Sequence, residues 1–332
     1  MNIRKPCMLA QLYADQVRPV NAASPELRFI NAVCAGLWED AVALFRERKL
    51  FLDEACAVDA PYGRYEGLSG IRAFAEGFVA RFGAERASLT PMFQTVANGR
   101  VALEAVLNLE VDGQIDQVPL FMVADLRTPA LLDELRIYTH FSFVPGLTPY
   151  RKPMFRSAHL EMGDPGLLTG AVRAYYEALH HAPYCDPEAV HRTFAPDCRM
   201  GGYEPWGTPL KTDEQRREQV ASFAQGLSAY IPACVGMRYE TLIDDGRTCV
   251  IEWVHIVSKQ GQRERNRVCL SGVSAYERND EGYLCSVRIS DYAGYERQID
   301  WSRTPISQQE AQAINLVEVF PAGCGRKPQQ EP

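Results

Sequence analysis

The stretch RVALEAVLNLEVDGQIDQVPLFMVADL, residues 100–126, decides the fold class. Two runs rich in valine and leucine, 100–111 and 117–126, are separated by a short segment that contains Gly113. Apolar, β-branched and aromatic residues on both sides of a glycine turn are typical of paired antiparallel strands. A third run of this kind follows at 135–143, so this part of the chain predicts an antiparallel sheet.

The residues before this stretch have helical spacing. Apolar positions in 26–45 recur every three or four residues, and Ser24 with Pro25 is a typical helix start. A second helix is expected over 71–82. Helices followed by a run of antiparallel strands predict an α+β fold, with the helices on one face of a curved sheet.

The second half of the chain repeats this order. Helices are expected over 167–181, 187–194 and 212–227, and strands over 238–243, 248–258, 267–278 and 283–293. VALE (101–104) corresponds to CVIE (249–252), and LRI (135–137) corresponds to VRI (287–289). A repeated element order predicts two similar domains. We place them at 22–148 and 166–303, with a linker at 149–165 and a partly disordered tail at 304–332.

Composition excludes several classes of function. The 332 residues carry a formal net charge of -7, which argues against nucleic acid as a partner. No apolar run is long enough for a membrane helix or a signal peptide, so we expect a cytoplasmic protein without membrane contact. The ten cysteines form no CxxC pair and are expected to be mostly buried free thiols. Neither a nucleotide-binding glycine motif nor HExxH is present, so no cofactor and no metal are predicted.

Short motifs in both halves resemble one known family. The first half has ALF at 43–45, VDAPYG at 58–63 and RIY at 136–138, and the second has FAPD at 194–197. In this order they resemble the nuclear transport factor 2-like (NTF2-like) superfamily, in its SnoaL-like polyketide cyclase and ketosteroid isomerase branch. The resemblance implies two tandem cone-shaped α+β barrels, each a curved, mostly antiparallel sheet wrapped around helices. It also implies a pocket for a small hydrophobic ligand and an intrachain pseudo-dimer, with a further homodimer left open.

The chain departs from the ketosteroid isomerase pattern. Phe29 stands in the first half where that pattern has a tyrosine, and Ala60 precedes the loop proline, with Asp59 one position early. In the second half Tyr175 matches the tyrosine, but the segment 200–202 has no carboxylate. Neither half carries the full set, so this mechanism is not expected.

The SnoaL-like pattern ends in an aspartate where this chain has His140. By resemblance, His140 is the expected catalytic base, with Tyr138 and Arg136 in the same row of the strand. An imidazole can take a proton from a carbon next to a carbonyl. The sequence thus predicts a cofactor-independent isomerase, cyclase or dehydratase of secondary metabolism, an isomerase or lyase acting on a polyketide-like or aromatic substrate. The first half is favoured as the active one.

Further side chains are expected to contact the ligand or to fix the sheet. The ligand candidates are Asp59, Tyr62, Tyr175, Trp206, Trp253, His255 and Tyr292. His255 shares a strand face with Trp253, and the sequence leaves open whether that face lines the pocket or an interface. Glu104 and Glu252 recur in the two halves, and we expect each to pair with an arginine such as Arg136 or Arg288.

A second interpretation stays open at this point. The missing carboxylates in both halves also fit a non-catalytic small-molecule-binding or dimerisation module. The substrate, the reaction type, the number of active pockets and the oligomeric state are not decided by the sequence.

Overall fold

The computed structural model describes residues 3–45, 56–146, 163–180, 186–205, 210, 212–230, 234–258 and 267–291. The chain forms two compact units, and each is described here by itself. The first unit contains the described residues up to 146, together with 201–205 and 289–291. The second contains the remainder. Most of the predicted linker and all of the predicted tail lie outside the described residues.

The first unit is an α+β structure with one mixed sheet. Its helices are α1 (Met8–Leu12), α2 (Pro25–Cys34), α3 (Trp38–Val42) and α4 (Gly67–Arg81), with a short 3-10 turn at Phe141–Phe143. Its strands are β1 (Ile3–Lys5), β2 (Ala57–Ala60), β3 (Gly63–Glu66), β4 (Arg86–Ala97), β5 (Arg100–Val111), β6 (Gln114–Thr128) and β7 (Leu131–Tyr138).

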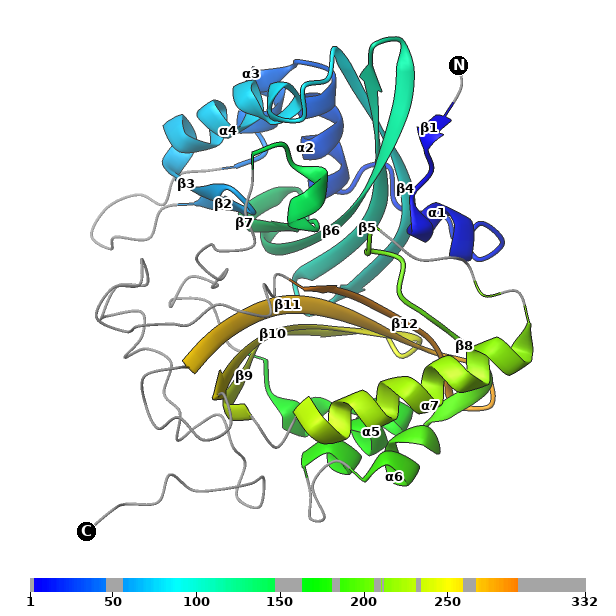
Figure 1. Cartoon of the computed structure of the whole chain (residues 1–332). Helices are drawn as coiled ribbons and strands as arrows, with labels where there is room; N and C mark the ends of the chain where they lie inside the picture. The colour runs from blue at the N-terminus through cyan, green and yellow to red at the C-terminus, as the bar shows by residue number, and fades with distance from the viewer. Residues whose placement is uncertain are drawn as a thin grey trace. The chain divides into compact units, whose positions relative to one another are not determined.

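The sheet of the first unit has the order β3-β2-β7-β6-β5-β4, and β1 pairs with β6. Strands β4, β5, β6 and β7 are antiparallel to one another, whereas β2 runs parallel to β7. Helices α2, α3 and α4 lie on one side of this sheet (Figure 1). We call this the helix-facing side and the opposite one the outer side.

Two features of the first unit differ from the sequence prediction. The helix expected over 26–45 is interrupted between α2 and α3, where Gly36 has φ 71°. Positive φ ends a helix at low cost only at glycine. Ser24 does occupy the N-cap of α2, but its side chain does not cap the helix. Its hydroxyl instead accepts a hydrogen bond from Gln94 Nε2 of β4 at 3.0 Å.

The second unit is also α+β. Its helices are α5 (Gly170–His180), α6 (Pro187–His191) and α7 (Asp213–Tyr230), after a short 3-10 turn at Pro165–Leu167. Its strands are β8 (Phe194–Met200), β9 (Cys234–Asp244), β10 (Thr248–Ser258), β11 (Arg267–Arg278) and β12 (Leu284–Asp291). The order β8-β12-β11-β10-β9 follows that of β2-β7-β6-β5-β4 strand by strand, and β8 runs parallel to β12. Helices α5, α6 and α7 lie on one side of this sheet (Figure 1).

Local chemistry explains the start of α7. Thr212 Oγ1 accepts from the backbone N–H of Gln215, and Gln215 Oε1 accepts from the backbone N–H of Thr212. This reciprocal capping box satisfies two amide groups that would otherwise lack partners. Strand β8 is not among the strands expected from the sequence, and its residues are recruited into the sheet by pairing with β12.

None of the helices in the described ranges has both the length and the apolar composition that a bilayer crossing requires.

Candidate functional site

The helix-facing side of the first sheet is an apolar core. Alternate residues of β5, β6 and β7 point to this side, and they are buried aliphatic side chains. They pack against buried residues of α2 and α4, with Phe29 and Phe74 at the centre. The members contributed by the three strands are Leu103, Ala105, Leu107, Leu109, Val118, Leu120, Met122, Ala124, Leu132, Leu135 and Ile137.

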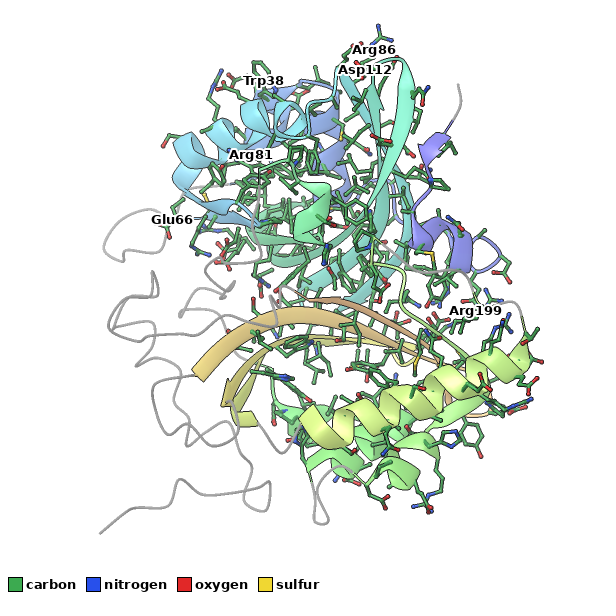
Figure 2. All side chains as sticks on the ribbon, in the orientation of Figure 1. Trp38, Glu66, Arg81, Arg86, Asp112 and Arg199 are labelled. Carbon is green, nitrogen blue, oxygen red and sulfur yellow. The ribbon has the colours of Figure 1, made fainter. Side chains whose placement is uncertain are left out.

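Stacked rings fill the space between these helices and the sheet. Phe74 stacks on Phe29, with 6.0 Å between ring centroids, and on Tyr62, with 6.2 Å. The guanidinium of Arg81, which is labelled in Figure 2, lies 4.3 Å from the centroid of the Tyr62 ring. Tyr62, expected to contact a ligand, is therefore part of an aromatic stack that ends in a cation–π contact.

The outer side of the first sheet carries the residues expected to form the active row. Arg136 pairs with Val123 and Tyr138 with Phe121, whereas the core residue Ile137 pairs with Met122 on the other side. Arg136 and Tyr138 therefore lie on the outer side, away from the helix-facing core. Both are almost fully buried, with exposed fractions of 1% and 2%.

Arg136 is held in a row of alternating charges. It donates to Asp125 Oδ2 at 2.7 Å and to Glu134 Oε1 at 2.9 Å. Arg64 donates to the other oxygen of Glu134 at 3.0 Å and lies 3.5 Å from Asp59 Oδ2. Asp59, expected to contact a ligand, thus takes part in this row. The row crosses neighbouring strands and contains Asp59, Arg64, Glu134, Arg136, Asp125 and Arg100.

The charges in this row stabilise one another. Burial alone would lower the pKa of the Arg64 guanidinium, but the nearby Glu134 and Asp59 carboxylates and its hydrogen bonds raise that pKa above its ordinary value. Paired buried charges of this kind fix geometry, because removing one partner leaves the other charge uncompensated. The arrangement indicates a structural role for Arg136.

His140 lies beyond the end of β7. Its Nδ1 accepts from the backbone N–H of Ser142 at 3.3 Å and lies 2.7 Å from Ser142 Oγ. Since Nδ1 accepts a hydrogen bond, the proton of the neutral ring sits on Nε2. This side chain is half-buried and closes a local turn next to Phe143.

The helix-facing side of the second sheet has a different character. Trp253 and His255 of β10 lie on this side, beside Tyr239 of β9, which pairs with Trp253. The contact between the rings of Tyr239 and Tyr176 of α5, at 5.8 Å, shows that this side faces the helices. Trp253, His255 and Tyr239 are all half-buried, unlike the fully buried aliphatic side chains at the corresponding place in the first unit.

Hydrogen bonds connect the polar groups along this side. Trp253 Nε1 donates to Ser274 Oγ of β11 at 2.9 Å. Ser274 and Tyr175 both hydrogen-bond to the hydroxyl of Tyr276. Burial raises the pKa of Tyr276 to about 12 despite these bonds, so the phenol stays protonated and can donate at neutral pH. Tyr175, expected from the sequence, is buried in this chain of polar groups.

His255 and His180 belong to the other end of the helix-facing side of the second unit, away from Tyr276. His255 stacks on Trp253 with 4.4 Å between ring centroids and an interplanar angle of 28°. Loss of water around the ring, and then the charge of His180 on α5, lower the pKa of His255 to about 3. His180 is buried against the ring of Tyr176 at 4.5 Å. The imidazole of His255 is therefore neutral at physiological pH.

The carboxylates next to these residues in sequence point the other way. Glu252 lies on the outer side, beside Val273 and Thr241, and is 1% exposed. On the same side Arg288 donates to Glu277 Oε2 at 3.2 Å and to Ser286 Oγ. In the first unit, the buried Glu104 accepts a hydrogen bond from the Tyr203 hydroxyl at 3.0 Å.

The structure places three of the predicted site residues between the helices and the sheet of the second unit, where Tyr175 and His255 lie at opposite ends. Tyr175, Trp253 and His255 share the helix-facing side of the second unit. The residues that the sequence prediction did not include are Tyr176, His180, Tyr239, Ser274 and Tyr276. Alternation along β9 and β11 could have selected the last three, since Tyr239 lies opposite Trp253, and Ser274 and Tyr276 lie opposite residues on the same side of β10 as Trp253. Trp206 and Tyr292 lie outside the described residues.

The described residues include several cysteines that are not in a disulfide bond. Cys7, Cys34, Cys56, Cys198, Cys249 and Cys285 are free thiols, as predicted for these positions. Burial raises the pKa values of Cys198 and Cys249 far above the ordinary range, which keeps both thiols protonated. Within the part of the chain that the structure describes, no three His, Cys, Asp or Glu side chains gather as a metal site would require.

Comparison with known proteins gives matches among solved structures. No family model and no curated protein matches the chain. A protein with a ketosteroid isomerase-like fold from Catenulispora acidiphila, solved with trimethylamine, is 16% identical, with 37% of this chain and 90% of that chain covered and a TM-score of 0.31. An NTF2-like protein from Cytophaga hutchinsonii is 15% identical (36% and 91% covered, TM-score 0.27). A putative polyketide cyclase from Sinorhizobium meliloti is 15% identical (34% and 92% covered, TM-score 0.27).

Proposed function

We propose that the second unit binds a small, uncharged ligand with a flat ring system on its helix-facing side, and that His255 moves a proton next to a carbonyl of that ligand without a cofactor. The observation that carries the proposal is the half-buried cluster of Trp253, His255 and Tyr239 opposite α5. The proposal assigns the chemistry to the second unit instead of the first, and tandem duplication of one fold is part of it.

The rings of this cluster suit a flat ligand. The indole of Trp253 and the phenols of Tyr239 and Tyr176 offer apolar faces together with hydrogen-bond donors. Small-ligand sites typically combine apolar walls with a few oriented polar groups. The cluster also disfavours a charged ligand, because the His255 imidazole is neutral and the neighbouring acid Glu252 is buried on the outer side.

The proton step uses His255 and Tyr239, which lie on neighbouring strands and on the same side of the sheet. A carbon–hydrogen bond next to the carbonyl breaks, the proton goes to an imidazole nitrogen of His255, and the electron pair forms the enolate. The hydroxyl of Tyr239 donates to the enolate oxygen. Return of the proton at the same or another carbon completes an exchange or an isomerisation, so neither oxidant nor cofactor is needed.

Tyr276 is too distant to serve as that donor. It pairs with Cys249, whereas His255 lies further along β10 opposite Leu270. At about 3.3 Å per residue, the separation along the strand is roughly 20 Å. The Tyr175–Tyr276 pair therefore serves to anchor the far end of a longer ligand or to fix α5 on the sheet.

A second candidate function has its own support. A pKa of about 3 makes His255 a weak base, and efficient general bases have pKa values near the working pH. The same cluster would then bind a ligand without turnover. This candidate keeps the ligand class and drops the proton step.

The two candidates are separated by one set of experiments. The full-length protein is purified, denatured, and its retained small molecules are identified by mass spectrometry. In parallel, β-tetralone, a bicyclic ketone, is incubated with the protein in D2O, and deuterium uptake next to the carbonyl is followed by NMR. We expect uptake at least about tenfold above buffer, and a return to the buffer rate in His255→Gln.

The controls locate the chemistry. His191→Gln removes an exposed histidine from α6 in the same unit and should leave the rate unchanged. Loss of exchange in His140→Gln, with His255→Gln unaffected, would move the reaction to the first unit. Binding of β-tetralone without faster exchange would support the binding function, and the absence of both binding and a retained ligand would contradict the proposal.

A further inference from the structure

The indole of Trp253 is fixed by two small residues of β11. Gly272 lies directly opposite Trp253, and a Cβ atom at this position would overlap Cζ2 of the indole and come within 2.7 Å of its Cη2. Real side chains do not approach this closely, so the ring occupies the space that a side chain at position 272 would take. A glycine within a strand often marks such a close approach.

A hydrogen bond fixes the other edge of the ring. Ser274, two positions from Gly272 on the same side of β11, accepts from Trp253 Nε1 at 2.9 Å. Ser274 is 1% exposed, so this is a buried bond whose loss would leave the indole N–H without that acceptor. Gly272 thus allows the indole to lie close against β11, and the hydrogen bond to Ser274 fixes the orientation of the ring in that position.

The Trp253 indole also contacts the ring of His255, which is on the same strand. Its ring stacks on the indole at 4.4 Å with an interplanar angle of 28°. Trp253 on its own strand and His180 from α5 are among the groups around His255. A fixed indole holds the imidazole in one orientation and keeps water from one of its faces.

We infer that Gly272 and Ser274 are positioning residues of the second unit, which act through Trp253 to hold the His255 imidazole in one orientation against the indole, and that this arrangement selects uncharged ligands over their ionised analogues. This inference rests on the proposed function for its ligand class. Its structural part, the coupling of Ser274 to His255 through the indole, is independent of any ligand.

The first test uses the ligand-free, full-length protein. Ser274→Ala removes the acceptor, and Ser274→Thr keeps a hydroxyl in a residue suited to strands. Ser222→Ala, an exposed serine of α7, is the matched control. The readouts are NMR titration of the His255 ring and the emission of Trp253, obtained as the difference from Trp253→Phe. We expect the pKa of His255 to rise toward its ordinary value and the emission to shift to longer wavelength in Ser274→Ala only.

A variant of Gly272 tests whether the close approach of the Trp253 indole to β11 matters. Gly272→Ala should displace the indole and produce the same two changes, whereas Gly226→Ala, a helix glycine with open space around it, should produce neither. If Gly272→Ala does not fold, the Ser274 series still decides the matter. Unchanged titration and emission in a folded Ser274→Ala protein would overturn the inference, as would identical behaviour of the alanine and threonine variants.

Selectivity is tested separately with β-tetralone and the carboxylate naphthalene-acetate as probes. The wild type should bind the ketone at least about tenfold more tightly than the carboxylate, since one unpaired buried charge costs more than 1.4 kcal/mol. Ser274→Ala should reduce this ratio, and an unchanged ratio would contradict the selectivity claim. If neither probe binds but the ring readouts change as expected, the proposed function fails and the positioning role stands.

Discussion

Arg136 and Asp125 form a buried ion pair on the outer side of the first sheet, with 2.7 Å between Nη2 and Oδ2. Arg288 and Glu277 form the corresponding pair in the second sheet at 3.2 Å. The two partners are 11 positions apart in both cases. Each unit therefore fixes its last two long strands with an arginine and an acid on the side away from its helices.

Removal of Arg136 should destabilise the first unit strongly. Arg136→Met leaves Asp125 and Glu134 buried without this partner, and we expect a loss of about 3–5 kcal/mol in the free energy of unfolding. Urea denaturation monitored by circular dichroism measures it. The control is Arg72→Met, whose ion pairs with Glu39 and Glu76 are exposed and should contribute much less to stability. Equal effects of the two changes would contradict the structural role.

The stacked rings of the first unit should matter for stability and not for the ligand. Phe74→Ala creates a cavity beside Phe29 and Tyr62, and we expect a loss of about 3–5 kcal/mol. Thermal unfolding measures it. At a temperature where the variant is folded, its deuterium exchange on β-tetralone should equal that of the wild type. A selective loss of exchange would return the chemistry to the first unit.

Glu26 should make stability depend on pH. Burial raises the pKa of this carboxyl, and Gln94 Nε2 donates to its Oε1 at 2.6 Å. A raised native pKa means that its contribution to stability is fully present below the model value of 4.5 and is lost as the pH rises through the native pKa. Glu26→Gln should therefore be more stable than the wild type at pH 7, with the difference vanishing below pH 4.5. The exposed Glu85→Gln serves as the control in the same denaturation series.

His255 should make the free energy of unfolding depend on pH in the opposite direction. Its pKa falls from 6.5 to about 3 on folding, so its contribution is present above pH 6.5 and is lost as the pH falls toward 3. His255→Gln should flatten the acid side of the stability curve between these values. Denaturant midpoints at half-unit pH steps measure it, with the exposed His191→Gln as reference. A curve for His255→Gln that superimposes on the wild type would contradict the neutral imidazole.

Alternation in the sequence predicted the strands better than it predicted their sides. The pairing around Gly113 and the presence of strands β5 to β7 and β9 to β12 follow from local patterns. The side of Arg136 did not, because alternation states which residues share a side and not which side the helices cover. Leu135 and Ile137 held the missing signal, since apolar neighbours on the core side place Arg136 on the other.

The sequence pattern did not predict which helix residues lie near which sheet residues. The approach of His180 to His255 joins residues far apart in the chain, and no local spacing encodes it. Strand β4 was also missed: its residues alternate between exposed and half-buried, and Pro91 lies beside a register shift that interrupts the pattern. Trp253 and Tyr175 could be picked out as ligand candidates because aromatic residues on a mostly aliphatic strand or helix face stand out, and that role stays a prediction.

Residues 201–205 belong to the first unit, although the chain reaches them only after α5, α6 and β8. Tyr203 from this segment covers Phe121 with its ring and donates to the buried Glu104, and Tyr13 donates to the carbonyl of Gly201. On the ribosome, at about 5–20 residues per second, the first unit must wait several seconds after β7 for this piece. Until then Glu104 lacks its phenol, so a nascent chain halted at residue 160 should be a better chaperone client than one halted beyond residue 210.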